Sequence, residues 1–255
     1  MPYVINDGLK IHYRVEGSGP PFVLLHGFTD SSESWYEFGY VSALQSKHRL
    51  ILIDSRGHGR SDKPHEPEAY TYEKFAFDVT CVLDDLRIPT AAYWGYSQGG
   101  GVGFAIAKFA PDRVSAFIIG GATASGASAF PIVAGAEDVL LEALRKGPDA
   151  IIGIYGDATS PALAERLRSN DMAALIACRK QRLISGGYPG VTRSISVPCL
   201  LYAGTADAIH DSARESGSQI AKCQFISLPE LNHPQAWVRS NLVLPEVQQF
   251  LDRLR

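Results

Sequence analysis

The 255-residue chain has few cysteines, and they lie far apart. Cys81, Cys178, Cys199 and Cys223 form no C-x-x-C pair, so we expect neither a disulfide framework nor a cysteine-ligated metal. No cluster of His, Asp or Glu has the spacing of zinc ligands. The cysteines are expected to be buried small apolar side chains in a reducing compartment. The sequence therefore predicts no metal and no cofactor.

Long apolar stretches and long basic runs are also missing. No stretch approaches the ~18 apolar residues of a membrane span, and residues 1–8 lack the charged and then apolar organisation of a signal peptide. The net charge is −3, so neither nucleic acid nor a membrane is an expected partner. We expect a cytoplasmic protein whose partner is a small-molecule substrate, and we make no prediction of its oligomeric state.

Nucleotide-binding signatures are absent as well. The chain contains no G-x-x-x-x-G-K-[ST] phosphate-binding loop. The glycine-rich run at 99–103 is not a strict G-x-G-x-x-G in the first strand-to-helix turn, so it does not indicate a dinucleotide site.

Short continuous apolar runs alternate with helical patterns along most of the chain. Such runs are typical of strands buried on both faces, and they occur at 22–25, 50–53, 114–119 and 197–202. Helical spacing of apolar residues occurs at 72–86, after residue 97, and at 243–254. The opening segment, with an Asp7-Gly8 turn, indicates an antiparallel hairpin. The alternation predicts a doubly wound α/β sheet.

One segment breaks this alternation. Residues 123–192 show helical patterns at 137–146 and 161–183, with a break expected in the second near 169–170, and no strong strand signal. The segment is too long for a loop in a compact domain. We expect residues 1–122 and 193–255 to form the core domain and 123–192 to form an inserted helical cap.

The pattern with the most chemical content is G-x-S-x-G at Gly95-Tyr96-Ser97-Gln98-Gly99. A short strand precedes it and a helical pattern follows, which is typical of a nucleophile elbow. Such a turn lifts a serine hydroxyl above a parallel sheet, holds the serine in an unfavourable backbone conformation and leaves room only for small neighbours.

With this elbow and this alternation, nearly the whole chain resembles the α/β-hydrolase fold superfamily, and its elbow and loops resemble those of small serine esterases and lactonases. The resemblance implies a mostly parallel eight-stranded sheet with an inserted cap. It also implies a triad in the order serine, acid, histidine, with an oxyanion loop before the serine. That loop matches His26-Gly27-Phe28-Thr29, so the amides of Phe28 and Gln98 are expected to form the oxyanion hole, and His26 to be structural.

The acid is expected after the strand that follows the cap, where Asp207 stands. Its competitor, Asp211, is better placed to begin a helix. The alternative position in this superfamily, after the strand at 114–119, is occupied by 120–123 and offers no carboxylate. Asp207 is thus predicted to orient the histidine.

The histidine is expected after the last strand, where His233 stands. We predict that His233 is the base that activates Ser97. The superfamily's recurrent loop matches residues 54–61, where His58 is expected to be structural and Asp54 and Arg56 to tie the strand end. The remaining histidines are interpreted as surface residues: His12, His48, His65 and His210.

Apolar side chains in the predicted cap favour a small or medium, largely apolar acyl or aryl substrate. The predicted substrate-binding residues are Phe28, Tyr96, Phe130 and Ile154. Epoxide- and halide-processing members carry Asp at the elbow, and perhydrolases often carry a proline after the oxyanion glycine, whereas this chain has Ser97 and Phe28. Ester or lactone hydrolysis through an acyl-enzyme is the leading hypothesis. A carbon–carbon hydrolase, a lyase, a perhydrolase or a small-molecule receptor are the alternatives.

Overall fold

A single eight-stranded sheet forms the centre of the protein. The computed structural model describes residues 2–126 and 138–254. The strands are β1 (Tyr3–Asn6), β2 (Leu9–Glu16), β3 (Pro21–Leu25), β4 (Arg49–Ile53), β5 (Ala91–Tyr96), β6 (Val114–Gly120), β7 (Cys199–Gly204) and β8 (Cys223–Leu228). Their order is β1-β2-β4-β3-β5-β6-β7-β8. The β1–β2 and β2–β4 pairs are antiparallel and all other pairs are parallel, which confirms the predicted sheet.

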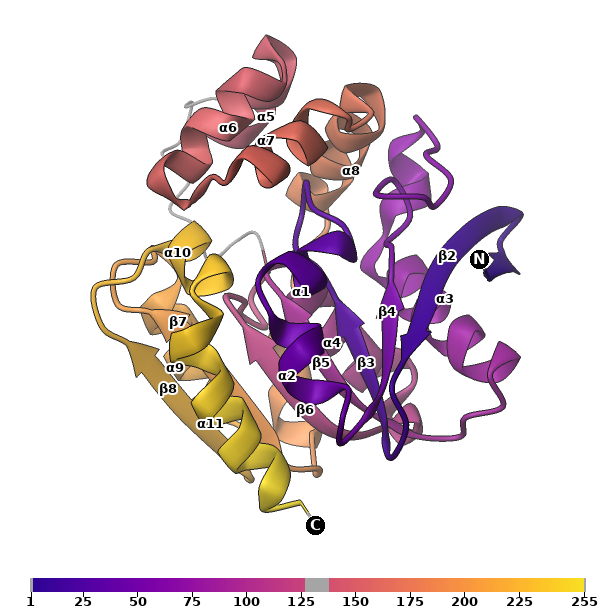
Figure 1. The fold of residues 1–255 in the computed structure, drawn as a ribbon, viewed down its shortest axis with the longest axis vertical. Coiled ribbons are helices and arrows are strands. Elements are labelled where there is room, and N and C mark those ends of the chain that lie inside the picture. The colour runs from indigo at the N-terminus through magenta and orange to yellow at the C-terminus, as the bar shows by residue number, and fades with distance from the viewer. Residues whose placement is uncertain (1, 127–137, 255) are drawn as a thin grey trace.

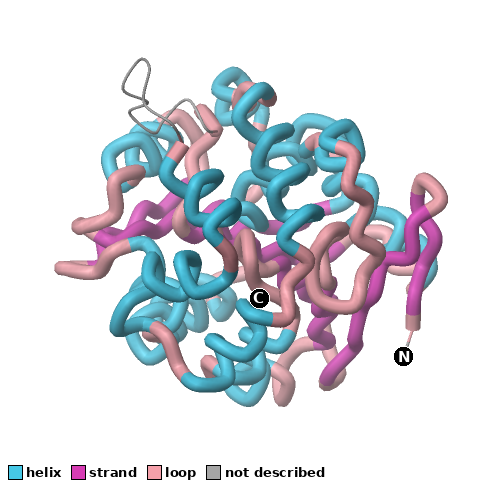
Figure 2. The backbone as a smooth tube through the Cα atoms, turned by 90° about the horizontal axis from the view of Figure 1, so that it is seen from above, coloured by secondary structure: helices cyan, strands magenta, loops and turns pink. Residues whose placement is uncertain are grey.

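Helices cover both faces of this sheet (Figures 1 and 2). Those of the sheet layers are α1 (Glu33–Glu37), α2 (Tyr40–Leu44), α3 (Tyr72–Asp85), α4 (Gln98–Phe109), α9 (His210–Ser218), α10 (His233–Val238) and α11 (Ser240–Asp252). Short 3₁₀ turns occupy Pro67–Tyr70, Pro111–Arg113, Gly156–Ala158 and Pro189–Ser194. The apolar pattern of the sequence does not predict α1 and α2, which are only five residues long each.

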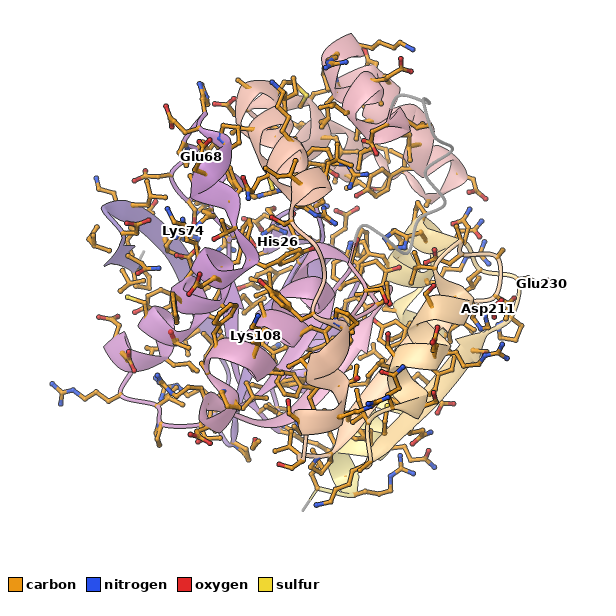
Figure 3. All side chains as sticks on the ribbon, turned by 180° about the vertical axis from the view of Figure 1, so that it is seen from behind. His26, Glu68, Lys74, Lys108, Asp211 and Glu230 are labelled. Carbon is orange, nitrogen blue, oxygen red and sulfur yellow. The ribbon has the colours of Figure 1, made fainter. Side chains whose placement is uncertain are left out.

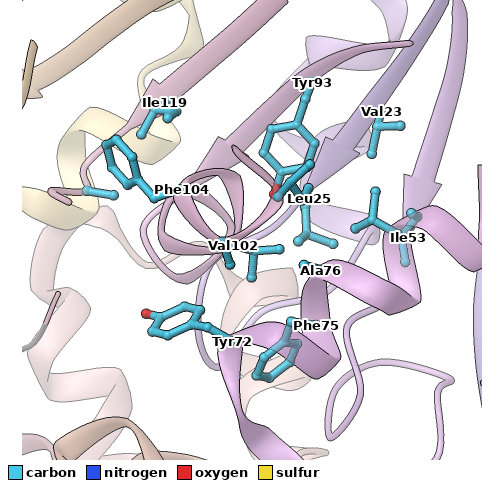
Figure 4. Packing of buried hydrophobic residues seen from close by; sticks show 14 of the residues in the cluster. Val23, Leu25, Ile53, Tyr72, Phe75, Ala76, Tyr93, Val102, Phe104 and Ile119 are labelled. Carbon is cyan, nitrogen blue, oxygen red and sulfur yellow. The ribbon is translucent and has the colours of Figure 1, made fainter. Parts of the chain in front are cut away.

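Alternation along each central strand divides the core into two layers. In β3, Val23 and Leu25 pack with α3 and α4, whereas Phe22 and Leu24 pack with α1, α2, α10 and α11. Figure 4 shows part of the first layer, in which Phe104 of α4 lies beside Ile119 of β6 and Val102 of α4 lies near Leu25 of β3. Because both faces are covered, the central strands are apolar throughout, as the sequence predicts.

Four further helices lie between β6 and β7, above one end of the sheet (Figure 1). They are α5 (Val139–Lys146), α6 (Pro148–Tyr155), α7 (Pro161–Arg168) and α8 (Met172–Ile184), here called the insertion helices. The expected break near 169–170 is present, because the Asp171 side chain caps α8 by accepting from the amide of Ala174. The division into a core domain and a cap at residues 123–192 stays a prediction.

Two histidines interpreted as surface residues are buried, so that interpretation was wrong for them. His12 lies in β2, which is covered by the loop after β4: the amide of His12 donates to Ser61 Oγ (2.8 Å), and its Nδ1 lies 2.9 Å from Asp54 Oδ2. His48 is buried beside the ring of Phe22. His65 is exposed, as expected, and His210 is half-buried.

His58 is also buried, which gives a prediction of pH-dependent stability. Burial, together with the nearby His26, lowers the pKa of His58 to about 3, whereas an unfolded histidine titrates near pH ~6.5. Above that pH both states are neutral and His58 has no effect. As the pH falls below it, only the unfolded chain takes up this proton, so the free energy of unfolding should fall by roughly 1 kcal/mol per pH unit.

Urea unfolding of wild type and His58→Gln between pH 7 and pH 4 measures this effect. The variant removes the titrating group, so its stability should fall less steeply with acid. Equal slopes in the two proteins would show that His58 does not contribute.

Candidate active site

Ser97 lies in the sharp turn between β5 and α4. Its backbone has φ 52° and ψ −108°, a strained conformation for a residue with a side chain. Its amide donates to Gly120 O (2.8 Å). A Cβ on Gly95 would lie 2.2 Å from Gly99 O, and one on Gly99 would lie 2.3 Å from Leu25 O. The turn is therefore so tight that its glycines are required.

The structure brings Ser97, His233 and Asp207 together. His233 Nε2 lies 2.8 Å from Ser97 Oγ, and His233 Nδ1 lies 2.6 Å from Asp207 Oδ2. Asp207 follows β7, and its other carboxylate oxygen accepts from the amide of Ile209 (3.1 Å). Its side chain is 2% exposed, so it is a shielded acceptor for the imidazole.

Local structure fixes the imidazole as well. His233 is the first residue of α10, where Asn232 and Gln235 form a capping box. The Tyr96 hydroxyl donates to the carbonyl of His233 (2.5 Å). With its Nδ1–H directed to Asp207, a neutral His233 presents the Nε2 lone pair to the Ser97 hydroxyl. This arrangement can remove the serine proton as the oxygen attacks an electrophile.

The predicted oxyanion loop lies beside the serine. A Cβ on Gly27 would be 3.4 Å from Ser97 Cβ, and Gly27, Phe28 and Ser97 line the same cavity. Within residues 2–126 and 138–254, the amides of Phe28 and Gln98 donate no hydrogen bond. Gln98 is also the first residue of α4, where free amides and the helix dipole favour negative charge. Their role as an oxyanion hole stays a prediction.

The residues expected to be structural are held inside the protein. His26 Nε2 accepts from the amide of Ser55 (3.1 Å), which joins the oxyanion loop to the end of β4; Figure 3 shows His26 in the interior. Asp54 accepts from the amides of Ser32 and Arg60. Arg56 forms a buried bidentate pair with Asp78.

The two rival residues lie away from the triad. His58 packs beneath Phe28, with ring centroids 5.6 Å apart. Asp211, by contrast, is an exposed residue of the first turn of α9.

A cavity of about 970 Å³ opens above Ser97, His233 and Asp207. Half of its other lining residues belong to the insertion helices, with Leu140, Leu141, Ile151, Ile154 and Tyr155 among them. Of the predicted substrate-binding residues, Phe28, Tyr96 and Ile154 line the cavity, although Tyr96 is almost fully buried. Phe130 lies outside the described residues.

Several lining residues were not found from the sequence. They include Thr29, Trp237, Asp138, Arg179 and Arg182. Of these residues, only the two arginines could have been noticed in the sequence. They lie three residues apart in a segment with helical spacing, so one face of α8 carries both.

The insertion helices are anchored to the oxyanion loop. Asn170 Nδ2 donates to Thr29 O (2.6 Å), and the Tyr155 hydroxyl lies 3.1 Å from Thr29 Oγ1. Arg166 donates to Ser34 Oγ (2.7 Å) just beyond this loop. The cavity is therefore built jointly by the sheet edge and the insertion helices.

A family model described as the alpha/beta hydrolase fold matches residues 20–139. The match includes β3 to β6 and the elbow at Ser97, and it ends where the insertion helices begin. The chain has the α/β-hydrolase fold. In the part that the structure describes, no helix is long and apolar enough to span a membrane, and no three His, Cys, Asp or Glu side chains gather as a metal site would require.

Among solved α/β-hydrolase structures, the esterase RhEst1 from Rhodococcus sp. ECU1013 is 28% identical, with a TM-score of 0.82 and coverage of 99% of this chain and 98% of that one. The enol-lactonase from Burkholderia xenovorans LB400 is 26% identical, with a TM-score of 0.82 and coverage of 98% and 100%. The bifunctional epoxide hydrolase 2 of Mus musculus is 37% identical over 114 residues, which are 44% of this chain and only 20% of the mouse protein. Together these relatives support a hydrolase.

Proposed function

We propose that this α/β-hydrolase is a serine hydrolase that cleaves a carboxylic ester or lactone of a small, largely apolar substrate through an acyl-enzyme. The observation that carries the proposal is the continuous hydrogen-bonded series from Ser97 through His233 to Asp207 at the floor of the cavity. Each side chain is held by its own local structure, so the three are positioned before a substrate arrives.

In the first half of the reaction, Ser97 Oγ attacks the carbonyl carbon while His233 Nε2 takes the hydroxyl proton. The carbonyl oxygen becomes an oxyanion, to which the amides of Phe28 and Gln98 donate. His233 then gives its proton to the alcohol oxygen, the ester C–O bond breaks, and the acyl group stays on Ser97.

In the second half, His233 takes a proton from water as the water oxygen attacks the acyl carbon. Collapse of the second tetrahedral intermediate breaks the bond to Ser97, and His233 returns the proton to Ser97 Oγ. Asp207 stabilises the imidazolium in both halves without taking the proton.

One observation favours this reaction over epoxide opening. The elbow carries a serine, Ser97, whereas the epoxide-processing members of this superfamily carry an aspartate there.

Hydrolysis of a series of 4-nitrophenyl esters of increasing acyl length tests the proposal. We expect saturable turnover with a maximum inside the series, because the apolar cavity accommodates an acyl chain of limited length. We also expect a rapid burst of nitrophenol, up to one equivalent per enzyme, wherever deacylation is the slower step. If the folded protein hydrolyses neither these esters nor a parallel set of lactones, ester chemistry is the wrong reaction for this site.

A further inference from the structure

Two arginines of α8, Arg179 and Arg182, line the cavity and differ in their partners. Arg179 donates to both oxygens of Asp138, through Nε (2.9 Å) and Nη2, and this pair lowers the pKa of Asp138 against the opposing effect of its burial. Arg182 forms no ion pair with any residue in 2–126 or 138–254. Among the described residues, the Arg182 guanidinium therefore has no carboxylate partner.

The Arg182 guanidinium also has few hydrogen-bond acceptors among the described residues. Its single hydrogen bond within the described residues is a long one, from Nη1 to Gln98 Oε1 (3.3 Å), and its Nε is buried without a partner. Its faces pack on the rings of Phe28 and Tyr72, with the guanidinium carbon 5.4 and 6.0 Å from the ring centroids. A buried donor without an acceptor is costly unless something else supplies one.

Arg182 touches the side chains of both predicted oxyanion-hole residues, Phe28 and Gln98. Arg182, Phe28 and Ser97 line the same cavity. A group bound by Arg182 therefore shares the cavity with the attacking oxygen of Ser97.

We propose that Arg182 binds a carboxylate on the acyl part of the substrate, so that the preferred substrates are monoesters of dicarboxylic acids or lactones that carry a carboxylate. This inference rests on the proposed function and specifies its substrate class. A guanidinium matches a carboxylate in shape and in charge. Because Arg179 is already paired with Asp138, Arg182 is the arginine of this pair that is left to bind a substrate carboxylate.

A pair of isosteric esters isolates the effect of a carboxylate at the end of the acyl chain of the substrate. The acyl chains of 4-nitrophenyl hydrogen adipate and 4-nitrophenyl hexanoate have the same length and differ at the end, a carboxylate in one and a methyl group in the other. We expect wild type to have the higher kcat/KM on the adipate ester. Arg182→Met should lower that kcat/KM by about 10- to 100-fold, mainly through KM, and should abolish the preference for the adipate ester over the hexanoate ester.

Two control variants distinguish binding of the substrate carboxylate by the Arg182 guanidinium from a general effect of positive charge on α8. Arg182→Lys keeps the cation and should retain part of the preference. Lys180→Met removes an equal charge from the exposed side of the same helix, outside the cavity, and should leave both esters unchanged. A variant of Arg182 that slows both esters equally would mean that it supports the oxyanion residues, which would overturn the proposal.

Binding provides a readout that does not depend on ester turnover. Calorimetric titration of the Ser97→Ala protein with monomethyl adipate and methyl hexanoate should show at least ~10-fold tighter binding of the adipate, lost when Arg182→Met is added. Equal binding of the two esters overturns the carboxylate site, even if the protein is an active esterase. Selective adipate binding without hydrolysis of any ester by wild type would keep the site and reject the esterase function.

Discussion

Ser97→Ala is expected to lower kcat for 4-nitrophenyl ester hydrolysis by roughly 10⁴- to 10⁶-fold. The substitution removes only the hydroxyl that lies 2.8 Å from His233 Nε2, so no acyl-enzyme can form. Steady-state kinetics at saturating substrate, with the same preparation checked by circular dichroism and thermal unfolding, measure the effect. The fold should persist, because alanine keeps the Cβ that the strained turn already accommodates.

The matched control is Ser115→Ala, which makes the same change at an exposed position of β6. Its kcat should be that of wild type. Turnover by Ser97→Ala at more than about one hundredth of the wild-type rate would contradict covalent catalysis through this serine, because removal of a nucleophile costs far more.

Asp207→Asn is expected to lower kcat by about 10⁴-fold. Asparagine can still accept from the amide of Ile209 through its oxygen, so the loop should keep its shape. Its amide group, however, would donate to His233 Nδ1. The imidazole proton would then sit on Nε2, directed at Ser97, and no lone pair would be available to take the serine proton.

The comparison variant for this effect is Asp211→Asn, the exposed rival in the first turn of α9, which should remain within about twofold of wild type. If Asp207→Asn retained a tenth of the wild-type kcat, another group would have to orient His233, and the assignment of the acid would be wrong.

The fold could be predicted because its signals are local. Each central strand is apolar along its whole length because both faces are buried, and the elbow compresses strand, serine and helix into five residues at 95–99. The break at 169–170 is likewise visible because Asp171 caps the next helix within three residues. The three triad residues could be proposed from the sequence because each lies within five residues of the end of a strand.

What could not be predicted depends on contacts between distant segments. Arg182 meets Gln98 across 84 positions of sequence, and nothing within α8 itself indicates that this arginine lacks a carboxylate. His12 was misread because burial of β2 comes from the loop after β4, about 40 residues later. The residues that line the cavity could not be predicted for the same reason. An apolar helix face has the same sequence pattern whether it packs on another helix or faces the substrate.

The most direct test of the central claim is reaction of the purified protein with a fluorophosphonate, followed by mass-spectrometric mapping of the modified residue. A serine activated by an adjacent histidine attacks phosphorus and keeps the adduct. We expect stoichiometric modification of Ser97, abolished in Ser97→Ala and strongly slowed in Asp207→Asn. Modification at another residue, or no modification of the folded protein, would contradict the assignment of Ser97 as the nucleophile.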